Sequence, residues 1–241
     1  MKTILIIGAM EEEILPLAGG EGFEHVEDKP FSYYIGESAG YRLIVTVSKV
    51  GLVAMGACVQ HFVTMLSRDP RFSGHSIDLV INMGVAGAIS AELEQGDIVV
   101  GDRICQHDMD VVGLGYEVGL NPDYPSVYFA TEPSVIDRVK RAYGALTTDY
   151  ELVVGTIASG DQFISSKEKK EFIENTFMAK ACEMEGAALA QVCFDNGVPF
   201  LVIRAISDKA DGEAPLSYGD FKAKAIDNIT GLITEFIKRG E

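Results

Sequence analysis

Short apolar runs that alternate with longer helical patterns are the feature that most constrains the fold of this 241-residue chain. Several of the short runs are continuously apolar and rich in Val and Ile, which is typical of strands covered on both faces. The expected strands are 3–8, 42–48, 78–83, 97–104, 152–159, 181–184 and 200–206. The expected helices are 53–66, 133–143, 167–175, 186–196 and 218–238. This alternation predicts a three-layer α/β/α fold with a twisted, mostly parallel central sheet.

No linker, repeat or low-complexity tract divides the sequence, so we expect residues 1–241 to form a single domain. Three segments rich in Gly, Pro or charged residues are expected to be irregular: 19–30, 113–126 and 210–217. In an open α/β sheet, ligands bind beyond the carboxyl ends of the strands. The residues that directly follow the predicted strands are therefore the first candidates for a functional site.

The charge balance narrows the choice of partners. The 36 acidic and 20 basic residues give a formal net charge of -16, which repels nucleic-acid phosphates and anionic membrane surfaces. No apolar stretch approaches the ~20 residues of a membrane span, and the N-terminal run 4–9 is too short for a signal peptide. Four widely spaced cysteines without a CxxC pair fit a reducing compartment. We therefore expect a cytoplasmic protein that binds neither nucleic acid nor membrane.

Carboxylates follow three of the predicted strands. Glu11 to Glu13 come after the first strand, where helix N-terminal charge is the simpler interpretation. Glu183 and Glu185 share one side if their strand persists. A buried carboxylate there is costly unless it binds something, such as the vicinal diol of a ribose, although a helix N-terminus explains the pair equally well. Asp208 is either a turn or cap residue or an acid withdrawn from water, which can hold and donate a proton near neutral pH.

Two further motifs are candidates for binding a ligand or a metal ion. Gly84 and Gly87 follow another predicted strand and either form a tight turn or let the backbone approach a flat ligand. No Gly-Lys-Ser/Thr follows them, so they do not form a phosphate-binding loop of that type. His107, Asp108 and Asp110 lack the spacing of a helical metal site, and we expect no metal and no cofactor.

Seven segments in this order resemble the purine nucleoside phosphorylase/uridine phosphorylase superfamily, and within it the 5'-methylthioadenosine/S-adenosylhomocysteine nucleosidase family. They are IIGAMEEE from Ile6, GVAGAIS from Gly84, GDIVVGD from Gly96, HDMDVVGLGYEVG from His107, ASGDQFI from Ala158, CEMEGAA from Cys182 and VPFLVIRAISDKAD from Val198. The segments span nearly the whole chain. The resemblance implies hydrolysis of the N-glycosidic bond of these two adenine nucleosides, with release of adenine, in methionine salvage.

The resemblance also implies a role for individual residues. Glu13 activates the attacking water, and Asp208, supported by Ser207, protonates adenine N7. Met184 and Glu185 bind the ribose, Phe163 and the Ile164 backbone bind the purine, and Met10, Val50 and Tyr218 line the pocket for the 5' substituent. The remaining expected contacts with substrate are Ala86, Gly87, Glu183 and Arg204. A homodimer is implied, in which Val111 and Leu114 of one subunit complete the pocket of the other.

Three positions depart from the family pattern. Many relatives have Ser at the position of Val85, and the change removes a hydroxyl that phosphorylases use near phosphate. Many also have an aromatic residue at the position of Leu114 and Phe at that of Tyr218, so the preferred 5' substituent stays open among methylthio, homocysteinyl, deoxy (as in 5'-deoxyadenosine) and futalosine-like groups. A phosphorylase is the nearest alternative, but the carboxylates after the first strand disfavour phosphate: two unit charges 4 Å apart repel by ~4 kcal/mol at an effective dielectric near 20. Hydrolysis of futalosine or its 6-amino analogue is a second alternative.

Overall fold

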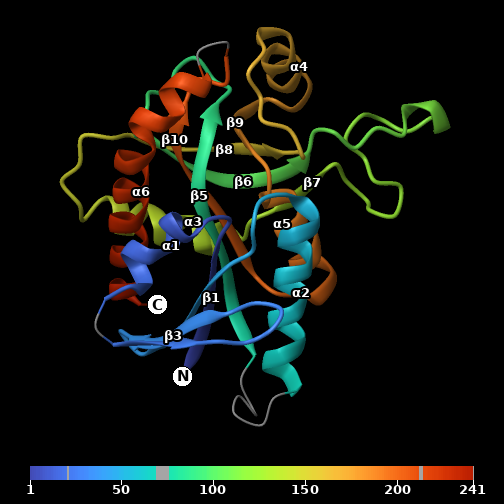
Figure 1. Ribbon diagram of the computed structural model, residues 1–241. Coiled ribbons are helices and arrows are strands. Elements are labelled where there is room, and N and C mark those ends of the chain that lie inside the picture. The colour runs from blue at the N-terminus through green and yellow to red at the C-terminus, as the bar shows by residue number, and fades with distance from the viewer. Residues whose placement is uncertain (21, 69–75, 212–213, 241) are drawn as a thin grey trace.

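Helices cover both faces of one large mixed sheet in the computed structural model (Figure 1). The structure describes residues 1–20, 22–68, 76–211 and 214–240, without the side chains of residues 214–218 and 220. The predicted α/β/α fold is confirmed. Among the described residues, no helix is long and apolar enough to cross a membrane.

The described residues form ten strands, six α-helices and one 3-10 helix. The strands are β1 (Lys2–Gly8), β2 (Phe23–Val26), β3 (Tyr33–Ser38), β4 (Tyr41–Val47), β5 (Ile77–Ala88), β6 (Ile98–Gln106), β7 (Tyr128–Ala130), β8 (Leu152–Ser159), β9 (Ala179–Glu183) and β10 (Phe200–Asp208). The helices are α1 (Glu11–Ala18), α2 (Leu52–Arg68), η2 (Val112–Leu114), α3 (Pro133–Tyr143), α4 (Lys167–Phe177), α5 (Gly186–Asn196) and α6 (Ala214–Arg239).

The strand order brings several strand ends together at one end of β5. The sheet runs β10-β6-β8-β9-β5-β1-β4-β3-β2, with β7 on β6, and β10 also pairs with β5. Both β1 and β10 run parallel to β5, so their carboxyl ends lie beside its carboxyl end. Strand β9 runs antiparallel to β5, with Cys182 opposite Gly87, which brings the residues after β9 to the same place.

Two apolar layers hold the helices on the sheet. On one face, α2 buries Met55, Cys58, Val59, Phe62 and Leu66 together with residues of α5. On the other face, α6 buries the five residues predicted from its helical periodicity: Ile229, Leu232, Ile233, Phe236 and Ile237. Strand β10 lies between the layers and is buried along its whole length, as its continuous apolar run predicted.

Several short elements were not predicted. Strand β2 lies inside the segment 19–30 that was expected to be irregular, and α6 begins at Ala214, inside the segment 210–217. Helix α1 contains Pro16, a residue that disfavours helix interiors, so its eight residues gave no helical pattern. Gly84 and Gly87 form no turn after their strand, because β5 continues through them to Ala88.

Substitution of Phe62 tests the apolar layer that packs α2 against the sheet. Its side chain is fully buried and packs edge-on against Tyr33. We expect Phe62→Ala to lower the free energy of unfolding by about 3–5 kcal/mol, because it leaves a cavity in a close-packed layer. Urea denaturation at fixed protein concentration measures the change. Phe172→Ala, on the exposed side of α4, is the matched control and should cost less than about 1 kcal/mol; equal losses for the two variants would contradict this packing.

Candidate active site

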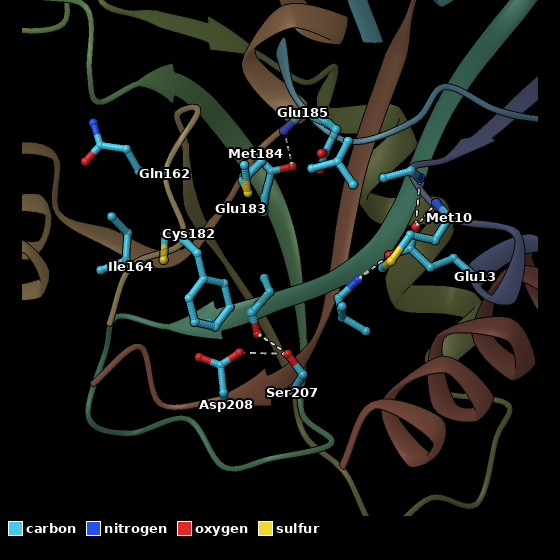
Figure 2. A pocket seen from close by; sticks show the side chains of 16 residues that line it. Met10, Glu13, Gln162, Ile164, Cys182, Glu183, Met184, Glu185, Ser207 and Asp208 are labelled. Carbon is cyan, nitrogen blue, oxygen red and sulfur yellow. Dashed lines mark hydrogen bonds between the residues drawn. The ribbon is translucent and has the colours of Figure 1, made fainter. Parts of the chain in front are cut away.

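A cavity of about 280 Å³ lies where the ends of β1, β5, β9 and β10 meet (Figure 2). Its lining is Ala9, Met10, Glu13, Val50, Val85, Ala86, Gly87, Gln162, Phe163, Ile164, Cys182, Glu183, Met184, Glu185, Ser207 and Asp208. The predicted site residues therefore come together in one cavity, apart from four that are described below. It is the cavity in which the carboxylates of three strand ends gather.

Glu13 enters the cavity from the first turn of α1. Its carboxylate accepts hydrogen bonds from the backbone N–H groups of Ala9 (2.7 Å), Met10 (3.0 Å) and Val85 (3.2 Å). The side chain is 3% exposed, and burial raises the pKa of Glu13, while the Arg204 charge opposes the rise. Glu13 thus caps its own helix, as the simpler interpretation held, and also presents a fixed, poorly hydrated carboxyl group to the cavity.

The two glycines of β5 make room for two carboxyl groups. A Cβ atom on Gly84 would lie 2.6 Å from Oε1 of Glu13. A Cβ atom on Gly87 would lie 2.9 Å from Oδ1 of Asp208. Both positions therefore require glycine, because any side chain would displace one of the two acids.

Asp208 lies at the end of β10, across the cavity from α1. Its Oδ2 accepts a hydrogen bond from the Ser207 hydroxyl (2.9 Å), and its Oδ1 accepts one from the Ala210 N–H (2.9 Å). Ser207 also contacts the Ala86 carbonyl at 3.3 Å. The Asp208 side chain is 2% exposed, and burial raises its pKa. A raised pKa is what a carboxylic acid needs to carry a proton at neutral pH.

Glu183 is held by protein groups at both oxygens. It accepts hydrogen bonds from the Ser159 hydroxyl, from the backbone N–H groups of Glu185 and Gly186, and from the Arg204 guanidinium. These contacts fix the turn between β9 and α5, where Met184 and Glu185 lie. Glu183 borders the cavity, but its hydrogen-bonding capacity is largely taken up by this turn.

Glu185 is the carboxylate with the most freedom to bind a ligand. Its Oε1 accepts a hydrogen bond from the Gly51 N–H at 2.9 Å, and its Oε2 lies 3.8 Å from Arg204. Burial and the neighbouring Glu183 charge raise the pKa of Glu185. Figure 2 shows Glu185 and Met184 side by side at one end of the cavity, away from Asp208. A ligand whose diol bound Glu185 would therefore extend through the cavity toward Asp208, the acid at the end of β10.

Three predicted site residues do not line the cavity, and nothing is described of the side chain of a fourth. Arg204 is 1% exposed and lies behind the lining, where it bonds Glu183 and Asn82. Val111 and Leu114 lie on a loop that projects from the body of the protein (Figure 1). The side chain of Tyr218 lies outside the described residues.

Four lining residues were not among the predicted site residues: Ala9, Val85, Gln162 and Cys182. Each is a sequence neighbour of a predicted residue, so position next to a strand end was the signal that could have found them. Their apolar or neutral side chains carry no chemistry that the sequence could single out. Among the described residues, no group of three or more His, Cys, Asp or Glu is arranged to hold a metal ion.

The family model of the Phosphorylase superfamily matches residues 3–238. The chain belongs to the phosphorylase superfamily. This membership confirms the resemblance predicted from the sequence motifs.

Similar superfamily members have related activities. A 5'-methylthioadenosine/S-adenosylhomocysteine nucleosidase of Marinomonas sp. (strain MWYL1) is 33% identical, with 99% of each chain covered. An aminodeoxyfutalosine nucleosidase of Helicobacter pylori is 35% identical over 93% of this chain and 94% of its own. The crystal structure of a Neisseria meningitidis nucleosidase in complex with methylthio-immucillin-A is 36% identical, with a TM-score of 0.90 and coverage of 99% and 100%.

Burial of Asp208 has a consequence for stability in this phosphorylase-superfamily fold. Its pKa in the folded protein lies above the ordinary value of 3.8. The folded state therefore holds this proton more tightly, and the group's stabilising contribution is full below pH 3.8 and is lost as pH rises through the folded-state pKa. We expect Asp208→Asn to raise the free energy of unfolding at neutral pH.

The expected gain should shrink as the pH falls toward 3.8, because both proteins then carry a neutral group. Urea denaturation at several pH values measures the difference between variant and parent. Asp137→Asn, at an exposed position of α3, controls for the loss of one negative charge. A difference that stayed constant with pH would contradict the raised pKa of Asp208.

Proposed function

We propose that the protein hydrolyses the N-glycosidic bond of 5'-methylthioadenosine and S-adenosylhomocysteine and releases adenine. The observation that carries this proposal is the pair of buried carboxyl groups, Glu13 and Asp208, on two sides of one cavity. Both have a raised pKa, and both are held by backbone N–H groups. An acid and a base on opposite sides of a scissile bond parallel the arrangement of inverting glycosidases.

The chemistry follows from the two positions. Asp208 donates its proton to adenine N7, so that the electrons of the breaking C1'–N9 bond go to a neutral leaving group. Water attacks C1' from the other side and gives its proton to Glu13. The sugar carries oxocarbenium-like positive charge in between, and the carboxylates nearby stabilise it. Glu185 binds the ribose hydroxyls, and Phe163 stacks on the purine.

Water is the proposed nucleophile because the cavity is poor in sites for phosphate. Arg204 is the buried cation nearest the site, and it is already paired with Glu183. Glu13 and Glu185 add negative charge, and Val85 has no hydroxyl to donate. Similarity to an aminodeoxyfutalosine nucleosidase favours one further candidate substrate, a nucleoside with a bulky 5' group.

We also propose that the enzyme works as a homodimer in the cytoplasm, with residues 1–241 as one nucleosidase domain. Apolar side chains are exposed on α2 and on the projecting loop: Val53 is 83% exposed and Leu114 75%. Val50 and Phe163 at the cavity are about half exposed, so a second subunit with its Val111 and Leu114 would close the site. The four cysteines are free and buried, which suits a reducing compartment.

Product analysis tests the choice of nucleophile. We expect 5'-methylthioadenosine to give adenine and the free methylthio sugar, at the same rate with and without inorganic phosphate. Chromatography of the products, with phosphate removed enzymatically from the buffer, makes the measurement. Formation of a sugar 1-phosphate that depends on added phosphate would assign the chain to the phosphorolytic members of its superfamily. The 6-amino futalosine analogue in the same assay compares the second candidate substrate.

Substitution of the two acids tests their roles. We expect Glu13→Gln and Asp208→Asn to fold normally and each to lower kcat for adenine release by about 10²–10⁴-fold, the usual contribution of one general acid or base. Glu12→Gln is the matched control, because Glu12 is exposed and pairs with Lys222 outside the cavity. Full activity of either variant would remove that residue from the mechanism, and an equal loss in Glu12→Gln would point to helix α1 as a whole.

A further inference from the structure

The first backbone N–H groups of α2 bond to carboxylates from other parts of the chain. The Gly51 N–H donates to Oε1 of Glu185 (2.9 Å), and the Leu52 N–H donates to Oδ1 of Asp161 (2.8 Å). N–H groups in the first turn of a helix have no partner inside the helix, and negative charge is favoured there. The two carboxylates therefore fix where α2 begins, and with it the position of Val50, which precedes the helix by two residues and lines the cavity.

The Asp161 carboxylate lies unusually close to this helix start. Gly51 has a φ of +102°, and a Cβ atom there would lie 3.0 Å from Oδ1 of Asp161. Only glycine suits both the backbone conformation and the short approach. The backbone conformation at Gly51 is therefore what allows the Asp161 carboxylate to reach the start of α2.

The backbone around Asp161 is held without help from its side chain. The Asp161 N–H donates to Oδ2 of Asp108 (2.9 Å), and the Gly160 N–H donates to the Glu183 carbonyl (3.1 Å). The next residues, Gln162 to Ile164, form another wall of the cavity. A change of the Asp161 side chain would therefore release α2 but leave this wall in place.

We propose that Asp161 is a positioning residue that holds the Val50 wall of the cavity and thereby sets how tightly the 5' substituent is bound. This inference rests on the proposed nucleosidase function. When Glu185 turns to the ribose hydroxyls, its bond to Gly51 is weakened or shared. The bond between Asp161 and Leu52 then keeps Val50 in place against the 5' group. Asp161 itself does not line the cavity, so it acts through Val50 and not by touching substrate.

Steady-state kinetics with two substrates tests the proposal. We expect Asp161→Ala to raise KM for 5'-methylthioadenosine about five- to tenfold, which lies within the range for the net contribution of one typical hydrogen bond. The rise should be at most about twofold for 5'-deoxyadenosine, which lacks the 5' substituent, and kcat should change little for either substrate. Asp161→Asn keeps an oxygen acceptor for Leu52 and should restore most of the binding. Asp137→Ala, at an exposed position of α3, is the control for loss of a surface carboxylate.

Hydrogen exchange of the Leu52 amide separates this inference from the proposed function. We expect faster exchange in Asp161→Ala and near-parental exchange in Asp161→Asn, whether or not the protein cleaves a nucleoside. Equal rises of KM for both substrates, or a loss of kcat instead, would overturn the proposal. Unchanged exchange at Leu52 would overturn it as well. If the parent protein released no adenine from either nucleoside, the proposed function would fail, while the exchange result would still decide whether Asp161 holds α2.

Discussion

The arrangement of the site depends on one buried guanidinium. Arg204 is the only arginine or lysine that is buried among the described residues, and it lies among three buried carboxylates, those of Glu13, Glu183 and Glu185. It bonds Glu183 and the Asn82 side chain, and it donates to two backbone carbonyls at 3.0 and 3.1 Å. Burying a charge is costly unless it is paired and hydrogen-bonded, and both terminal nitrogens of Arg204 have such partners, whereas its Nε has none among the described residues. Burial raises the pKa values of Glu13 and Glu185 by more than the Arg204 charge lowers them, and the direct ion pair of Arg204 with Glu183 leaves these two carboxyl groups available for a ligand.

Strand β5 fixes the positions of these acidic groups relative to one another. It pairs with β1, β9 and β10, the strands whose ends carry the acids, so each acid has a fixed distance to the same backbone. Gly84 leaves space for Glu13 and Gly87 leaves space for Asp208, three residues further along the strand. The two glycines are thus needed because acids approach the strand from both neighbours, which sequence alone could not distinguish from a tight turn or a ligand-binding backbone. A rigid central strand also preorganises the acid and the base before any substrate arrives.

The sequence predicted those elements whose position depends on a local pattern of apolar residues. Continuous apolar runs identified β8 and β10, and helical periodicity identified the buried face of α6, because burial on both faces or on one face leaves a clear signature. Pattern failed for α1, β2 and β3, which are short or lie at the edge of the sheet. At the site, strand ends predicted the carboxylates but not their partners. Whether Arg204 would bind substrate or a neighbouring acid depends on strands β5, β9 and β10 meeting in space, and no spacing along the chain encodes that contact.

The division between strands and loops also bears on substrate choice. The groups proposed for glycosidic chemistry, Glu13, Glu185 and Asp208, all lie at or next to strand ends, where the sheet fixes them. Among the groups proposed to face the 5' substituent, Val50 lies on the β4–α2 connection, and Val111 and Leu114 lie on the projecting loop that carries η2. Loops tolerate change better than the scaffold, so one set of acids can serve nucleosides with different 5' groups. Relatives that act on methylthioadenosine and on aminodeoxyfutalosine are almost equally similar to this chain, as expected if the strand-based chemistry is common and only the loops differ. Residues that hold those loops, such as Asp161, then matter for specificity without touching the substrate.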